Sequence, residues 1–193
     1  MKKLLTTTIL VAMIASLGAA FAQQPHQASH RVEVHIPSVL MIRITNGTDN
    51  AAVPSPDAVV FDLSSLAAAD FEPADTYSPT NLDPAPNWND VRVFANGGGW
   101  RVTVATDVGS HPTGVPTFDW SKVRVEPSGD DAIANFSLPA AGVSADIAGG
   151  PTATRTNGWL SLGFGPTDFR LHLDGTEEAG NYSATVTYTI AHP

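Results

Sequence analysis

Alternation of apolar and polar side chains is the dominant pattern in this chain. It is clearest near the C-terminus, where residues 182–190 place Tyr182, Val186, Tyr188 and Ile190 on one face and three threonines on the other. A period-2 pattern of aromatic, β-branched and small residues is typical of a strand that covers a core with one face. The opposite, threonine-lined face can be left to water.

Shorter runs of the same kind recur along the chain, separated by Asn-Gly, Gly-rich and Pro-rich turn signals. They cover residues 31–36, 39–45, 59–63, 90–95, 100–106, 122–126, 132–138, 143–147, 159–164 and 169–173. The runs 90–95 and 100–106, joined by Asn96–Gly99, are the most convincing hairpin. Because no amphipathic helix interrupts the series, the pattern predicts an all-β fold, an immunoglobulin-like antiparallel β-sandwich of about nine strands.

One long stretch departs from this pattern. Residues 49–89 hold six prolines and many alanines and aspartates. Connections of this length are unusual in compact domains. We expect a long Pro-rich crossover loop between the two sheets, and a functional surface loop is the alternative.

The N-terminus has the features of a secretory signal peptide. Lys2 and Lys3 precede an apolar run that ends in the small-x-small site Ala20-Phe21-Ala22. We therefore expect residues 1–22 to be removed and residues 23–193 to form a single β-sandwich domain. An uncleaved membrane anchor is the alternative, although the apolar run is shorter than the roughly 20 residues that span a bilayer. The protein is then secreted to the bacterial periplasm or cell surface, with no integral membrane segment after cleavage.

Charge and cysteine content narrow the list of partners. The chain has 19 acidic and 10 basic residues, a formal net charge of −9, and no cysteine. An acidic surface disfavours nucleic acid and anionic membranes as partners, because both are bound through basic contacts. A secreted domain without disulfide bonds must be stabilised by its core alone, which a chain of this length can provide.

No catalytic motif stands out. No serine occurs in a nucleophile-elbow sequence, and no carboxylate pair is singled out by its position. The turns at Asp130-Asp131 and Glu177-Glu178 could contribute oxygen ligands to Ca²⁺, but solvated turns are the simpler interpretation. We expect no cofactor and no enzymatic activity.

The tryptophans have different predicted roles. Trp100 alternates with Val102 and Val104 and is expected in the core. Trp88 lies in the Pro-rich stretch and Trp159 follows an Asn-Gly turn, so these two are candidate platforms for stacking on sugar rings. The alternative is that both close one end of the sandwich core.

Two stretches resemble the signatures of the WxL family of bacterial cell-surface domains. The first, residues 99–104, has a tryptophan followed two residues later by an aliphatic residue, and the second, residues 180–190, ends in Tyr-Thr-Ile. The residues that carry the resemblance are Trp100, Val102, Tyr182, Tyr188 and Ile190. Tyr188 stands where the family has tryptophan, and Val102 and Ile190 replace leucines. The resemblance implies an extracytoplasmic β-sandwich held noncovalently on the cell wall; the closing strand is also similar to fimbrial and spore-coat-type sandwiches.

The start of the closing strand has a second likeness. Gly180 and Tyr182 resemble the turn-and-tyrosine entry of immunoglobulin-like sandwiches, in which a tyrosine hydroxyl ties a corner to the backbone. This feature favours the same fold class as the alternation.

Together these observations favour a noncatalytic cell-envelope or surface protein, structural or adhesive, that associates through its β-sandwich. Its partner would be itself, as an oligomer or filament, or cell-wall polysaccharide or peptidoglycan. Exposed sheet edges offer one route to self-assembly, and residues 31–36 could serve as a strand donated to another subunit. The alternative is a carbohydrate-binding module that uses exposed tryptophans; an unrecognised secreted hydrolase is the third hypothesis.

Overall fold

The structure is a computed structural model that describes residues 31–46, 51–64, 66, 74–128 and 133–193. The chain divides into two units at the bond between Ile36 and Pro37. In the first unit only residues 31–36 are described, and they belong to no strand. The second unit contains every strand of the described residues. The predicted signal peptide, residues 1–22, lies outside the described residues.

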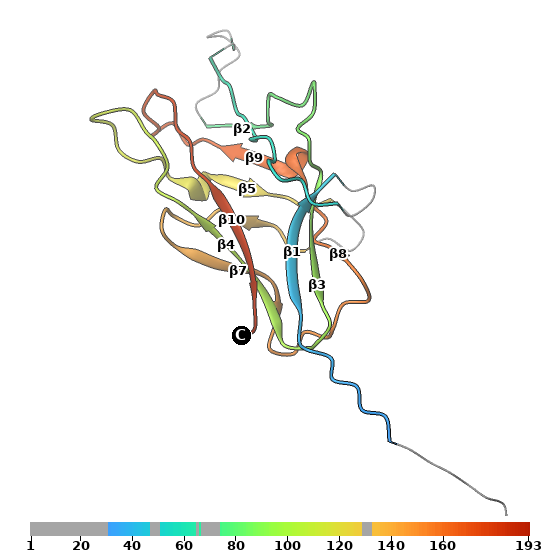
Figure 1. Cartoon of the computed structure of the whole chain (residues 1–193). Helices are drawn as coiled ribbons and strands as arrows, with labels where there is room; N and C mark the ends of the chain where they lie inside the picture. Colours follow the sequence, from blue (N-terminus) through green and yellow to red (C-terminus); the bar gives the residue numbers. More distant parts are fainter. Residues whose placement is uncertain (1–30, 47–50, 65, 67–73, 129–132) are drawn as a thin grey trace, which may run out of the picture. The chain divides into compact units, whose positions relative to one another are not determined.

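The second unit is an all-β sandwich made of three antiparallel sheets (Figure 1). The first sheet has the order β1-β3-β8, with β1 Leu40–Thr45, β3 Asp90–Ala95 and β8 Leu160–Ser161. The second sheet has the order β10-β4-β7, with β10 Val186–Ala191, β4 Trp100–Thr106 and β7 Ser144–Gly150. The all-β fold predicted from alternation is therefore confirmed.

The third sheet is smaller and has the order β2-β9-β5-β6. Its strands are β2 Thr76–Tyr77, β9 Phe169–His172, β5 Val123–Val125 and β6 Phe136–Ser137. Two short 3₁₀ turns, Trp120–Lys122 and Pro166–Asp168, lead into β5 and β9. Figure 1 shows β5 and β9 crossing the direction of β3 and β4 at one end of the unit. Within the described residues, no helix is long and apolar enough to cross a membrane.

The core is built from the inward faces of the strands. Alternate residues of β3 and β4 are fully or almost fully buried, whereas the residues between them are partly exposed. This is the expected outcome of period-2 alternation when one face of each strand is covered. The buried side chains of these two strands are Val91, Val93, Ala95, Trp100, Val102 and Val104, and valines and aromatics of β5 and β9 join them.

The predicted hairpin of residues 90–95 and 100–106 is wrong in its pairing, although both strands form at the predicted bounds. β3 pairs with β1 and β8, whereas β4 pairs with β10 and β7. The turn Asn96–Gly99 therefore carries the chain from one sheet to the other. Alternation shows that each strand has one buried face, but it does not distinguish strands that pair edge to edge from strands that face each other across a core.

Two other predicted strands are not strands in the structure. Residues 31–36 have no partner strand among the described residues. In residues 59–63, side chains take the place of a partner strand: the Val60 amide donates to Asn81 Oδ1 at 3.0 Å, and the Asp62 amide donates to Thr80 Oγ1 at 2.9 Å. Both runs have the alternation of a strand but lack a regular neighbouring backbone.

The predicted crossover is correct only in part. The stretch leaves the first sheet after β1, contributes β2 to the third sheet, and returns to the first sheet as β3. The stretch thus contributes a strand to another sheet but does not cross over for good, because β3 pairs with β1, the strand before the stretch. Residues 49–50, 65 and 67–73 of this stretch are outside the described residues.

The closing strand is shorter than predicted. Alternating burial persists from Tyr182, but β10 begins only at Val186. Residues 181–185 run beside the segment that follows β4 through an isolated bridge between Ser110 and Ser183. The Tyr182 hydroxyl donates to the Glu178 carbonyl oxygen at 2.8 Å. The expected tie between a tyrosine hydroxyl and the backbone of the preceding corner is confirmed.

Candidate binding groove

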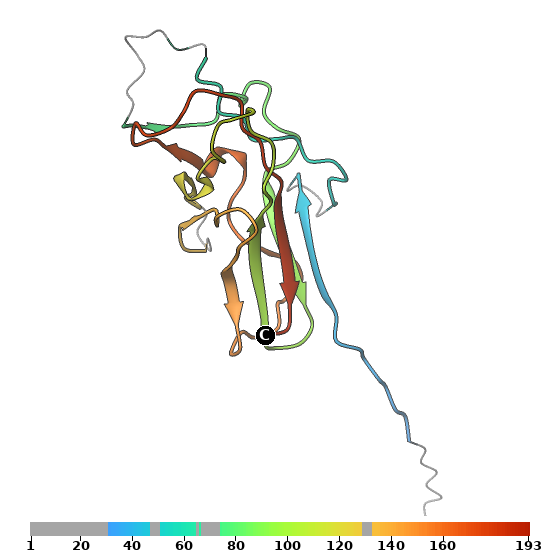
Figure 2. The same ribbon diagram turned by 90° about the vertical axis from the view of Figure 1, so that its left-hand side faces the viewer.

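An apolar groove lies between β1 and β10 in the second unit. Each of these strands lies at the end of its sheet, with β3 and β4 as their respective paired neighbours. The two strands approach each other but do not pair, and Figures 1 and 2 both show them side by side. The space between them is about 530 Å³, and its lining residues are Leu40, Met41, Ile42, Arg43, Ala52, Trp159, Tyr188, Thr189 and Ile190.

The backbone of both strands offers hydrogen-bonding groups to this groove. In β1 the Thr45 carbonyl faces β3, because it accepts from the Asn89 amide at 3.0 Å. Residues of a strand point their backbone groups to alternate sides, so those of Leu40 and Ile42 face the groove. The far end of this edge is partly covered, since the Val53 amide donates to the Ile44 carbonyl at 2.8 Å.

The same argument applies to β10. The Thr185 carbonyl accepts from the Asp107 amide at 3.1 Å, which places residue 185 toward the β4 side. Residues 186, 188 and 190 therefore direct their N–H and C=O groups away from β4 and into the groove. Unpaired edges of this kind are templates for another strand.

The apolar side chains along the groove are only half-buried. Val91, Val93, Val102 and Val104, in the neighbouring strands, are all 0% exposed. The inward-facing residues of the two edge strands pack on the same core yet remain partly exposed; they are Leu40, Ile42, Ile44, Val186, Tyr188 and Ile190. The core is thus less well covered along the groove than along β3 and β4.

The outer rim of the groove carries a cation and an aromatic ring. The Arg43 guanidinium lies over the Trp159 ring, 3.3 Å from its centroid, and Phe94 packs against the same ring at 5.8 Å. Arg43 Nε is buried and has no hydrogen-bond partner among the described residues. The positive charge of this guanidinium would favour an incoming carboxylate at the rim.

The two tryptophans predicted as sugar platforms lie in different environments. Trp88 is only 6% exposed; its Nε1 donates to the Asp57 carbonyl at 2.8 Å, and its ring packs edge-on against Phe169. A buried ring cannot serve as a stacking surface, so this position fits the core alternative. Trp159 is half-buried and lines the groove, with Arg43 over one part of its ring.

The residues expected in the core occupy it to different degrees. Trp100 and Val102 are buried, and Trp100 Nε1 donates to the Thr154 carbonyl at 2.7 Å. Tyr188 and Ile190 are at the groove, where the Tyr188 ring contacts Phe164 at 5.6 Å between centroids. Burial raises the pKa of Tyr188 above its usual value. Tyr182 is half-buried beside Phe118, at 5.4 Å between ring centroids.

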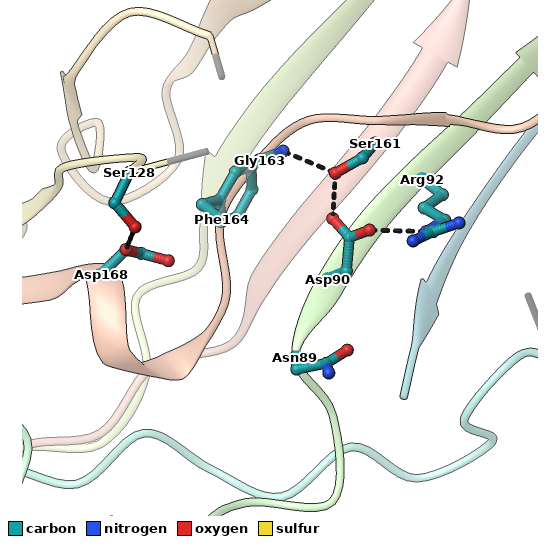
Figure 3. Close-up of a pocket in the computed structure, with 8 residues that line it drawn as sticks. All are labelled: Asn89, Asp90, Arg92, Ser128, Ser161, Gly163, Phe164 and Asp168. Atoms are coloured by element: carbon teal, nitrogen blue, oxygen red, sulfur yellow. Dashed lines mark hydrogen bonds and ion pairs between the residues drawn. The ribbon is translucent and has the colours of Figure 1, made fainter. Parts of the chain in front are cut away.

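A second hollow, of about 340 Å³, is polar and lies where the start of β3 meets β8 and the turn before β9 (Figure 3). Asp90 accepts hydrogen bonds from Ser161 Oγ at 2.8 Å and from Arg92 Nε at 2.5 Å. Asp168 accepts from Ser128 Oγ at 2.9 Å and from the Gly165 amide at 2.7 Å. Both carboxylates are hydrogen-bonded to neighbouring residues, so we interpret the polar groups around this hollow as structural links between segments.

The predicted calcium ligands do not form a site in the described residues. Asp130-Asp131 lies outside the described residues, and no group of three or more His, Asp or Glu side chains suited to a metal occurs within them. Glu177 is engaged with Lys122 Nζ, which also donates to Asp174 Oδ1 at 2.8 Å and to Thr176 Oγ1 at 3.1 Å. This cluster links the 3₁₀ turn before β5 to the turn after β9.

The ionisation of this tie follows from its hydrogen bonds. The hydrogen bond from Lys122, with those from Thr176, holds the pKa of the Asp174 carboxyl well below its usual value. Burial opposes ionisation of Glu177, but hydrogen bonds from Lys122 and backbone amides still lower the pKa of that carboxyl. Burial likewise opposes the charge of Lys122, and its bonds to the two carboxylates outweigh this and raise its pKa.

Sequence reasoning identified Trp159, Tyr188 and Ile190 separately but did not bring them together. It also missed Arg43 and Ala52, because nothing in the local pattern shows that residues 40–43 and 188–190 lie at facing edges of two sheets. The available signal was indirect: β1 and β10 are alternating runs near the two ends of the strand series. Comparison of the chain with models of known families, with curated proteins and with solved structures finds no match.

Proposed function

We propose that this chain is a noncatalytic structural or adhesive subunit of the bacterial cell envelope or surface, which associates noncovalently through the edges of its β-sandwich. The observation that carries the proposal is the groove between β1 and β10. The open edge of β10, the uncovered part of the β1 edge and half-covered apolar side chains meet there, which suits the groove to accept another β-strand.

Several features of the sequence support the proposal. The N-terminus has the pattern of a secretory signal, and the chain lacks a recognisable catalytic motif. The immunoglobulin-like description of the fold belongs to the same proposal; it is supported by the tie from the Tyr182 hydroxyl to the Glu178 carbonyl. The WxL resemblance, with Trp100 and Tyr188 at its signature positions, points to the same extracytoplasmic setting.

The alternative, a carbohydrate-binding module, now depends on Trp159. Trp88 is buried, so it offers no stacking face, whereas Trp159 is half-buried at the rim of the groove. Titration of peptidoglycan fragments and a glycan panel, followed by tryptophan fluorescence, tests this alternative. A saturable shift that disappears in Trp159→Ala and persists in Trp88→Phe would favour it over self-association.

The main proposal is tested on the chain from Gln23 onward, the predicted secreted form. We expect light scattering and negative-stain microscopy to show oligomers, sheets or filaments, and fractionation of the native host to place the protein with the envelope. A protein that stays monomeric across the accessible concentration range and is absent from envelope fractions would contradict the proposal.

A further inference from the structure

Residues 31–36 form an alternating segment whose apolar side chains are left uncovered. Val32, Val34 and Ile36 are 73%, 76% and 78% exposed, and they share one face because they are spaced two residues apart. The other face is polar, with Arg31 paired to Glu33 at 2.7 Å. Three neighbouring aliphatic side chains on one face of a strand-forming segment are an unusual exposure for a soluble chain and favour a docking partner.

We propose that Arg31–Ile36 of one copy inserts as an additional β-strand into the groove between β1 and β10 of a second copy. This inference rests on the proposed function, because it specifies the route by which the subunit associates. The groove then receives a backbone partner for one of its open edges, that of β10, and apolar side chains for its half-covered core.

The lengths match. The segment has six residues, as do β1 and β10. Six residues in an extended strand span about 20 Å, which is the length of β10, whereas Val53 already covers one end of the β1 edge. Pairing with β10 would satisfy the groove-facing N–H and C=O groups of Tyr188, which face outward from its sheet.

The side chains also match. With the aliphatic face inward, Val32, Val34 and Ile36 would cover the half-buried row that includes Ile42, Tyr188 and Ile190. The polar face would then lie along the outer rim, where Arg43 has a buried Nε without a hydrogen-bond partner among the described residues. Glu33 provides a carboxylate of the opposite charge on that face.

A second copy fits better than the chain's own segment. To lie along its own β1, the chain would have to reverse at residues 37–39. The Pro37 carbonyl accepts from Asn96 Nδ2 at 2.8 Å, and the Val39 amide donates to Asn96 Oδ1 at 2.7 Å. These bonds fix residues 37–39 on the connection between β3 and β4, so a reversal would have to be made within the segment itself and would leave fewer of its residues to pair.

The test uses two variants of the chain from Gln23 onward with the same charge. The first carries Val32→Asp, Val34→Asp and Ile36→Asp. The second carries Arg31→Asp, Glu33→Asp and His35→Asp, which changes the formal net charge by the same amount but leaves the aliphatic face intact. All six positions are exposed, so neither variant should disturb the sandwich, and thermal unfolding of the dilute monomer checks this.

We expect the first variant to associate about a hundredfold more weakly than wild type, because three aliphatic side chains can no longer be buried. The second variant should associate to nearly the same extent as wild type. Unchanged assembly of the first variant would overturn the inference and leave the proposed function standing through another edge. A wild-type chain that stays monomeric would instead contradict both the proposed function and this inference.

Cysteine pairs locate the segment in the groove, since the chain has no cysteine of its own. Glu33→Cys or His35→Cys is combined with Thr187→Cys or Thr189→Cys on the exposed face of β10. We expect at least one combination to form disulfide-linked ladders under mild oxidation. Cysteine at the exposed Val143, in place of the β10 position, is the control. Disulfides within single chains only, or ladders as efficient with the control, would overturn the inference.

Discussion

Single residues in this fold are constrained most where two backbones approach closely. Gly109 has a φ of 62° beside residues 183–184, and a β-carbon at this position would lie 1.7 Å from the Ser183 carbonyl oxygen. The closing strand can run beside the segment after β4 only because residue 109 has no side chain. Gly142 has a φ of 76° but no heavy atom within 4 Å of its would-be β-carbon.

Substitution of these two glycines distinguishes the cost of a left-handed backbone from the cost of a steric clash. Gly109→Ala should destabilise the domain by about 3 kcal/mol, because the left-handed backbone and the clash both contribute. Gly142→Ala, which meets only the backbone strain, should cost about 1 kcal/mol. Urea unfolding of both variants measures the difference, and equal losses would mean that the backbone near Ser183 moves aside without cost.

The tie at Lys122 gives a second prediction at this scale. The side chains of Lys122 and Glu177 are 15% and 14% exposed. Lys122→Gln should reduce the free energy of unfolding by about 2 kcal/mol at neutral pH, since it leaves a largely buried carboxylate with fewer donors. Arg124→Gln, two residues along and exposed, is the control and should change stability by less than about 0.5 kcal/mol. Similar losses in both variants would contradict the role assigned to the tie.

The same cluster of Lys122, Asp174 and Glu177 predicts that the free energy of unfolding depends on pH in the acid range. The pKa values of Asp174 and Glu177 are lowered from 3.8 and 4.5, so their contribution is complete above these usual values and is lost as the pH falls through the lowered ones. The stability difference between wild type and Lys122→Gln should therefore be largest at neutral pH and shrink progressively below pH of about 4. Urea unfolding over a pH series measures it, and a constant difference would be inconsistent with this assignment.

At the scale of elements, segments with the same alternation of apolar and polar residues differ in how far their apolar side chains are buried. Val93 in β3 and Val34 in the N-terminal segment both stand in alternating runs, yet Val93 is 0% exposed and Val34 is 76% exposed. Val93→Ala should destabilise the sandwich by about 2 kcal/mol. Val34→Ala should be neutral within about 0.5 kcal/mol in a dilute monomer, where the segment has no partner. A comparable loss for Val34→Ala in the monomer would show that the segment already packs within its own chain.

This contrast also shows how far sequence reasoning reached. The bounds of β3 and β4 followed from alternation and the Asn96–Gly99 turn, because both signals are local. The pairing of the two strands was predicted wrongly, because edge-to-edge and face-to-face neighbours leave the same period-2 trace. Residues 59–63 were predicted wrongly for a related reason: the side chains of Thr80 and Asn81, with one bond from the Thr80 amide to the Val60 carbonyl, satisfy that backbone without forming a ladder.

At the scale of the whole molecule, the groove was the feature least accessible from sequence. Tyr188 and Ile190 were predicted to cover a core, and they do so only in part because β10 is the end of its sheet. Arg43 and Trp159 are 116 positions apart and meet only when β8 joins β3 beside β1. A site made of facing sheet edges depends on topology, which short-range patterns do not encode.

One consequence follows from having an uncovered strand-forming segment and an open groove on the same chain. Joining unlike surfaces head to tail closes a pair only where two chains exchange segments reciprocally; otherwise growth would continue until a larger ring closes or subunits run out. Such a polymer is polar: one end presents a free segment and the other a vacant groove. A single chain with an intact groove and a disabled segment would then act as a terminator at one end only, and a small fraction of it would shorten the whole population.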